Sequence, residues 1–119
     1  MAKRGYEHGN YEGLGWIDCE VVKINSNKLR LPHIGWNNVK INQKEERLLD
    51  GMKNDLLFYF NHSYCISEVK DKFFTKILTA NYGSEFIVAG KKNNIIGIQP
   101  HPEKSQINGI KFLQNCFKN

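Results

Sequence analysis

Two prolines enclose a histidine in Ile98-Gln99-Pro100-His101-Pro102-Glu103-Lys104-Ser105, the stretch that limits the fold of this chain most strongly. A proline fixes its own φ and disfavours the helical region for the residue before it, so Gln99 and His101 are expected to be extended. Residues two apart in an extended chain point to the same side. We therefore predict that Glu103 lies beside His101, with its carboxylate holding the imidazole. Such a pair supplies two members of a nucleophile–base–orienter triad.

The segments on either side of this stretch predict a strand followed by a helix. Asn94–Gln99 is apolar enough for a strand, and Ser105–Phe117 has helical periodicity, with Ser105 as its N-cap. The helix is expected to pack on a sheet through an apolar stripe of Ile107, Ile110, Leu113 and Phe117. Ligands of open α/β sheets gather at the carboxyl ends of strands, which favours a site here. Spacing alone leaves a surface loop with two polar residues equally open.

Short apolar runs further upstream predict more strands. They are Trp16–Ile24, Trp36–Ile41, Leu56–Phe60, Tyr64–Val69, Lys76–Ala80 and Phe86–Ala89. The continuous run Leu56–Phe60 is typical of a parallel strand buried on both faces, and Gln43–Met52 predicts one short helix. The elements indicate an α/β fold with a mixed sheet. Because the helices are too few to cover both faces of that sheet, we expect these residues to form part of a domain.

Composition excludes several classes of function. The 119 residues suit one small domain, and the net charge of +5 comes from scattered basic residues without interleaved aromatic side chains, so no nucleic-acid partner is expected. No apolar run approaches the roughly 20 residues that cross a bilayer, and no signal peptide is present, so we expect a cytoplasmic protein without a membrane partner. The cysteines, Cys19, Cys65 and Cys116, are widely spaced, which favours packing over a disulfide, zinc or nucleophilic role.

Two further motifs each leave two interpretations open. His62-Ser63-Tyr64 directly follows an apolar run, so it is either the rim of a site or a strand end reaching solvent. Pro32-His33-Ile34-Gly35-Trp36-Asn37 is either a turn with Trp36 in the core or a surface for a partner, since Trp is enriched at binding hot spots.

Taken together, the motifs resemble one enzyme family. Gly97–Ser105 is similar to the histidine–proline–glutamate signature of class I glutamine amidotransferases, which use a Cys-His-Glu triad to hydrolyse glutamine and pass ammonia to a partner. Pro32–Asn37 is more selective. With Gly13-Leu14-Gly15 before it and Asn61–Tyr64 after it, this motif resembles the glutaminase subunit of imidazole glycerol phosphate synthase.

The resemblance implies a role for each matching residue and a place for the chain in the fold. His101 matches the base and Glu103 its orienting acid. The positions that line the glutamine pocket are His62, Ser63 and Tyr64, and those that face the (β/α)₈ barrel of the cyclase subunit are Pro32, Trp36 and Lys104. Residues 1–119 would be the C-terminal portion of a three-layer amidotransferase domain. No metal or organic cofactor is implied.

The chain also departs from the family pattern. The Gly-x-Cys-x-Gly elbow that carries the catalytic cysteine is absent, as is the glycine-rich segment of the oxyanion hole, so Met1 is expected to follow the missing cysteine by a few residues. Pro100 stands where the family usually has an aromatic residue. Two alternatives stay open: a paralogue serving nitrogen transfer in surface-sugar synthesis, and a non-catalytic module that docks on the cyclase barrel.

Overall fold

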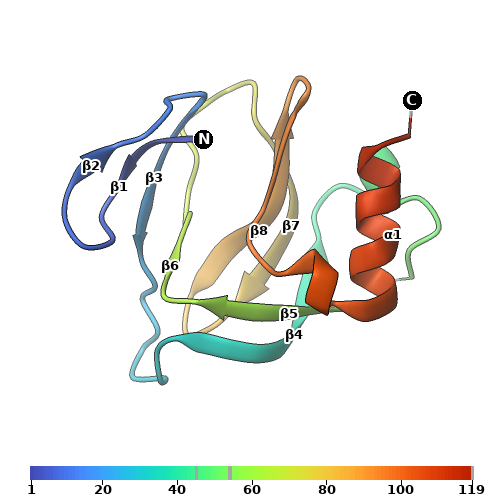
Figure 1. Ribbon diagram of the computed structural model, residues 1–119, viewed down its shortest axis with the longest axis horizontal. Coiled ribbons are helices and arrows are strands. Elements are labelled where there is room, and N and C mark those ends of the chain that lie inside the picture. Colours follow the sequence, from blue (N-terminus) through green and yellow to red (C-terminus); the bar gives the residue numbers. More distant parts are fainter. Residues whose placement is uncertain (45, 54, 119) are drawn as a thin grey trace.

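The computed structural model describes residues 1–44, 46–53 and 55–118. Within these ranges the chain forms nine strands, one α-helix and two short 3₁₀ helices. The strands form two sheets, with strand orders β2-β1-β3-β6 and β5-β4-β7-β8-β9. Figure 1 shows the smaller sheet on the left, the larger sheet in the middle and the α-helix on the right.

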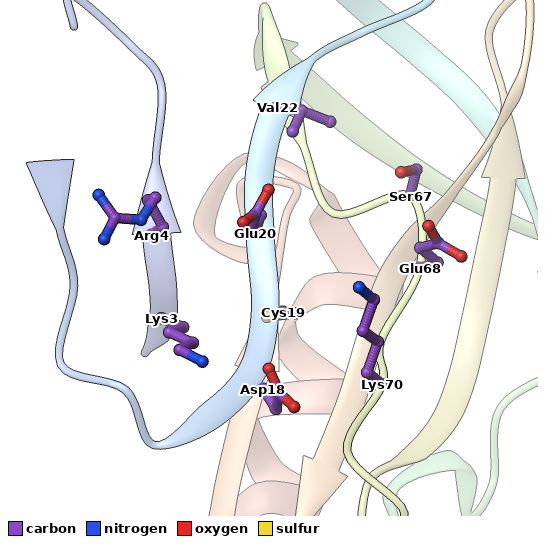
Figure 2. A pocket seen from close by; sticks show the side chains of 9 residues that line it. All are labelled: Lys3, Arg4, Asp18, Cys19, Glu20, Val22, Ser67, Glu68 and Lys70. Atoms are coloured by element: carbon purple, nitrogen blue, oxygen red, sulfur yellow. The ribbon is translucent and has the colours of Figure 1, made fainter. Parts of the chain in front are cut away.

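The smaller sheet contains β1 (Ala2–Gly5), β2 (Tyr11–Glu12), β3 (Ile17–Lys23) and β6 (Tyr64–Cys65). β1 runs parallel to β3, and the other pairs are antiparallel. A pocket of about 390 Å³ opens between β1, β3 and residues 67–70 (Figure 2). Its lining mixes cations and anions: Lys3, Arg4, Asp18, Cys19, Glu20, Val22, Ser67, Glu68 and Lys70.

The larger sheet contains β4 (His33–Ile41), β5 (Leu56–His62), β7 (Thr75–Asn81), β8 (Glu85–Lys92) and β9 (Ile95–Ile98), all paired antiparallel. One face of this sheet carries the main core. The most completely buried side chains there include Phe58, Phe60, Ile77, Leu78, Phe86 and Val88, with Phe112 of the helix against them. Burial of each contributes roughly 1.5–3 kcal/mol to folding.

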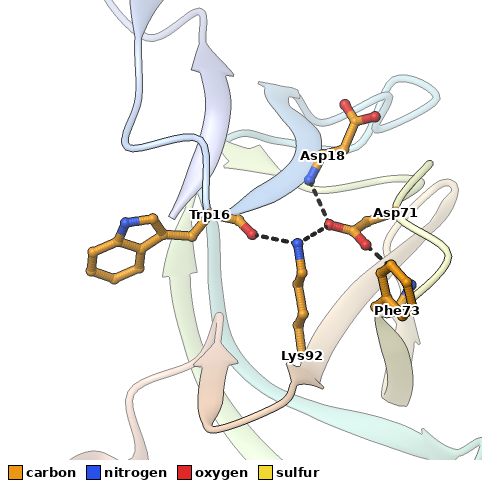
Figure 3. Close-up of polar contacts among 5 residues, drawn as sticks. All are labelled: Trp16, Asp18, Asp71, Phe73 and Lys92. Atoms are coloured by element: carbon orange, nitrogen blue, oxygen red, sulfur yellow. Dashed lines mark hydrogen bonds and ion pairs between the residues drawn. The ribbon is translucent and has the colours of Figure 1, made fainter.

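A cluster of polar contacts joins the two sheets (Figure 3). The Nζ of Lys92, at the end of β8, lies 2.6 Å from Oδ2 of Asp71 and donates to the carbonyl of Trp16 at 2.9 Å. The Asp71 carboxylate also accepts the backbone N–H groups of Asp18 and Phe73. The hydrogen bond from Lys92 is the main cause that lowers the pKa of Asp71. The charge pair therefore fastens the start of β3 to the end of β8.

The structure confirms the mixed sheet with few helices, and most of the predicted strands. Tyr64–Val69 is shorter than predicted: only Tyr64–Cys65 forms a strand, and Val69 makes one isolated bridge to Cys19. The sheets are mainly antiparallel, with β1 and β3 as the parallel pair among the described strands. None of the helices in the described ranges is long and apolar enough to cross a membrane.

Two predicted elements need correction. Leu56–Phe60 is not buried on both faces: Leu56, Phe58 and Phe60 are buried, but Leu57 is 42% exposed. β5 is an edge strand whose outer face meets solvent, so its side chains alternate in spite of their shared apolarity. The helix predicted over Gln43–Met52 is a 3₁₀ turn, η1 (Arg47–Leu49), started by a bond from the Leu48 N–H to the Glu46 carboxylate. Residue 45 lies outside the described residues.

The predicted C-terminal helix is confirmed as α1 (Gln106–Cys116), but the predicted buried stripe is wrong. Ile107, Ile110 and Phe117 are 79%, 57% and 82% exposed, whereas Gly109, Phe112 and Asn115 are buried. The reason is close approach. A Cβ on Gly109 would lie 1.8 Å from the carbonyl oxygen of Pro102, and the Asn115 side chain donates to the carbonyls of Leu48 and Asp50. The helix turns its small and polar residues inward.

Candidate active site

His101 and Glu103 form the hydrogen-bonded pair that their spacing predicts. Nδ1 of His101 lies 2.8 Å from Oε1 of Glu103, and both side chains are exposed. His101 is extended as expected, but Glu103 belongs to a 3₁₀ turn, η2 (Pro102–Lys104). The backbone N–H of Glu103, and after it His101, lower the pKa of the Glu103 carboxyl. With Nδ1 held by the carboxylate, Nε2 of His101 is free to accept a proton.

The edge strand β5 holds this pair in place. The His101 N–H donates to the carbonyl of Tyr59 at 2.9 Å. Ser105 is 1% exposed; its hydroxyl accepts the Tyr59 N–H at 2.9 Å and donates to the His101 carbonyl at 2.7 Å. Ser105 occupies the predicted N-cap position of α1, yet its side chain makes no capping bond. It instead ties the catalytic segment to the sheet.

The His62-Ser63-Tyr64 motif lies at the end of the same strand. His62 is half-buried, and its Nδ1 donates to the carbonyl of Tyr64 at 2.9 Å. Burial lowers the pKa of His62; the bond to Tyr64 opposes that shift, and the charge of His101 adds to it. The structure thus brings the His101 pair and the His62 motif to one strand, three residues apart at Tyr59 and His62.

Two of the three residues predicted to face a partner share a surface. Trp36 is 47% exposed, which excludes a core role, and its ring meets Tyr59 edge-on at 6.0 Å. The Nζ of Lys104 lies 5.8 Å from the centre of the Tyr59 ring. Ile34 and Leu57, also exposed, extend this apolar face of β4 and β5. Pro32 is exposed directly before β4.

Sequence reasoning missed His33 as a site residue. It is 3% exposed, stacks between Phe60 and Tyr82, and lies 2.9 Å from His62 through their ring nitrogens. The pairing of β4 with β5 sets His33 opposite His62. Only that register reveals the contact, because the two residues are 29 positions apart.

The cysteines are packing residues, as their spacing suggested. Cys19 and Cys65 are buried and Cys116 is half-buried. Burial is the main cause that raises the pKa of each thiol, for Cys65 to about 11. A thiol that stays protonated is a poor nucleophile. Apart from Cys19, no residue considered for chemistry lines the pocket of Figure 2. Among the described residues, no three His, Cys, Asp or Glu side chains gather as a metal ion would require.

Comparisons with known proteins agree with this geometry. The family model of class I glutamine amidotransferases matches residues 10–119. Imidazole glycerol phosphate synthase subunit HisH 1 of Campylobacter jejuni is 44% identical over 95% of this chain and 55% of that protein. The HisH subunit of Pelagibacter ubique is 42% identical over 97% of this chain and 55% of that protein. The chain therefore spans about half the length of the curated relatives it matches.

A solved structure shows the same fold. The crystal structure of a candidate GMP synthase component from Thermoplasma acidophilum aligns with a TM-score of 0.66. The alignment covers 82% of this chain and 46% of that protein, at 20% sequence identity.

Proposed function

The chain belongs to the class I glutamine amidotransferase family, and we propose that it forms part of the glutaminase subunit of imidazole glycerol phosphate synthase. In this role it would act in histidine biosynthesis in the cytoplasm. The observation that carries the proposal is the 2.8 Å hydrogen bond between His101 and Glu103, which leaves Nε2 of His101 available. The similarity to curated HisH subunits supports the choice of pathway over surface-sugar synthesis.

The proposed reaction converts glutamine and water to glutamate and ammonia. A cysteine thiol gives its proton to Nε2 of His101, and the thiolate attacks the side-chain amide carbon of glutamine. The imidazolium, stabilised by Glu103, returns the proton to the leaving nitrogen, and ammonia departs from the resulting thioester. His101 then takes a proton from water, which attacks the thioester and releases glutamate. The cysteine belongs to a Gly-x-Cys-x-Gly elbow that these 119 residues do not contain.

The remaining predicted residues complete the proposal. His62, Ser63 and Tyr64, at the end of β5, would contact the amino-acid end of glutamine. The apolar face with Trp36 and Lys104, and Pro32 beside it, would meet the (β/α)₈ cyclase barrel that uses the ammonia. The chain would accordingly represent the C-terminal portion of the amidotransferase domain.

A second candidate function is docking without catalysis. It is favoured by the exposure of Trp36, Ile34 and Leu57, an apolar face that does not depend on a nucleophile. Capture of the chain by the Campylobacter jejuni cyclase subunit, lost in Trp36→Ala, would support it. The two functions separate in His101→Ala, which should leave capture intact and remove only glutaminase activity.

Growth of a histidine auxotroph tests the proposed function. A chimera replaces the matched region of the Campylobacter jejuni HisH 1 relative with this chain, in a strain that lacks its own HisH subunit. The medium is low in ammonium, because free ammonia would replace the product of glutamine hydrolysis. We expect growth without histidine from the chimera and from His8→Ala, an exposed control, but not from His101→Ala. Failure of the chimera where the intact relative restores growth would contradict the proposal.

A further inference from the structure

His33, His62 and Asn37 form a buried chain of hydrogen bonds beside the proposed glutamine site. Nδ1 of His33 lies 2.9 Å from Nε2 of His62, and Nε2 of His33 lies 3.1 Å from Nδ2 of Asn37. At the far end, Nδ1 of His62 lies 2.9 Å from the carbonyl of Tyr64. Every ring nitrogen of both histidines therefore has a partner within the chain.

Asn37 determines which nitrogen of His33 carries the proton. The Asn37 Nδ2 is also 3.2 Å from the carbonyl of Asn81, which can only accept a hydrogen bond. This contact identifies the amide nitrogen, so the second amide hydrogen points at Nε2 of His33. Nε2 of His33 is therefore an acceptor, and the neutral ring carries its proton on Nδ1.

The other end of the chain leads to the same direction independently. The Tyr64 carbonyl can only accept, so Nδ1 of His62 must carry a proton. The neutral His62 ring then has a bare Nε2, which accepts from Nδ1 of His33. The two ends agree on the central bond: His33 donates and His62 accepts.

An extra proton on either ring would break this arrangement. On His62 it would oppose the Nδ1–H of His33, and on His33 it would oppose the amide of Asn37. Burial, and for His33 also the neighbouring His62, lower the pKa of both rings, that of His33 to about 4. Phe60 and Tyr82 stack on His33 with ring centres 4.9 and 4.0 Å away, which fixes the plane of its ring.

We propose that His33 is a positioning residue that holds His62 in its Nδ1–H tautomer, so that His62 in turn holds the Tyr64 carbonyl at the glutamine site. The identity of the ligand rests on the proposed function; the link between the two histidines does not. Both nitrogens of the His62 ring are used within the chain, so this ring offers glutamine no N–H. Contact with the substrate falls to Ser63, Tyr64 and the backbone of the segment.

The tautomers can be measured directly in the ¹⁵N-labelled chain, from two-bond ¹H–¹⁵N correlations of the histidine rings. We expect His62 as the neutral Nδ1–H tautomer in the wild type. His33→Phe keeps the stacking but removes the donor, and should move His62 toward the Nε2–H form. His33→Asn restores an N–H donor near the position of Nδ1, and should restore the wild-type signature. His8→Phe, at an exposed histidine, is the matched control.

Each outcome decides one part of the proposal. An Nε2–H tautomer of His62 in the wild type overturns it, even if His33→Phe fails to fold. An unchanged His62 signature in a folded His33→Phe variant overturns it as well. The link to substrate is read by adding L-glutamine and following the amide signals of Ser63 and Tyr64, which should shift in the wild type and in His33→Asn and lose that shift in His33→Phe. No shift in the wild type would count against the proposed function alone, because the tautomers still test the histidine link.

Discussion

His33 and His62 make the stability of the chain depend on pH. Burial lowers the pKa of His33 to about 4 and lowers that of His62, whereas an unfolded histidine titrates near 6.5. Between these values the unfolded state binds more protons, so stability is fully present above about pH 6.5 and is lost as the pH falls toward 4. The groups that face His33 are His62, Tyr82 and the neutral Asn37.

We predict that the free energy of unfolding falls by about 2 kcal/mol from His33 alone between about pH 7 and pH 4.5. Urea unfolding at the two pH values measures this loss, which should shrink in His33→Asn and persist in His8→Asn. Equal losses in the wild type and His33→Asn would contradict the assignment of the pH dependence to His33.

The two histidine sites were not equally predictable from sequence. The contact of His101 with Glu103 was predicted correctly because two prolines restrict the chain locally. The contact of His33 with His62 depends on the register of β4 against β5, which no local rule supplies. Ser105 shows the same limit: its position before α1 was predicted, but its bonds to Tyr59 and His101 come from the packing of separate elements.

At the scale of elements, the approach of α1 to η2 positions the proposed catalytic pair. Gly109 lets the helix backbone lie against Pro102, one residue from both His101 and Glu103. In an ordinary helix interior, Gly→Ala stabilises by roughly 0.5–1 kcal/mol. Here the new Cβ would fall 1.8 Å from a backbone oxygen that cannot yield without moving η2.

We therefore predict that Gly109→Ala destabilises the chain by about 1–3 kcal/mol, the usual cost of overpacking. Chemical denaturation compares it with Gln114→Ala, on the exposed side of α1, which should change stability by less than about 0.5 kcal/mol. A stabilised Gly109→Ala variant would show that α1 and η2 do not pack as closely as described.

Elements were predicted more reliably than the faces they bury. The periodicity of Ile107, Ile110 and Phe117 identified α1 correctly but assigned its apolar side to the interior. The buried side is chosen by Gly109 and Asn115, which hydrophobicity patterns ignore. In β5 an unbroken apolar run concealed an alternating strand, because its outer face forms the exposed patch with Leu57.

On the scale of the whole molecule, the chain exposes more apolar surface than a stable monomer usually does. The outer side of α1 presents Ile107, Ile110 and Phe117, and the half-buried strand β9 ends the larger sheet as an edge. Unpaired edge strands and apolar patches both promote association.

We predict that the chain in dilute solution is only marginally stable, by about 5 kcal/mol or less, and self-associates as its concentration rises. Sedimentation should show smaller species for the double variant Ile107→Lys, Phe117→Lys than for Gln114→Lys, which adds charge without removing apolar surface. A cooperative, monomeric unfolding transition of the wild-type chain would count strongly against this expectation.

Ammonia release from glutamine by the chimera, in the presence of the cyclase subunit, tests the central claim about His101 and Glu103 most directly. We predict that the 119 residues alone release none, because they carry no elbow cysteine and their own thiols are held protonated. The chimera should release ammonia at a rate that His101→Ala lowers by about 10²–10⁴-fold, while His8→Ala leaves it unchanged. A chimera whose rate survives His101→Ala would contradict the account.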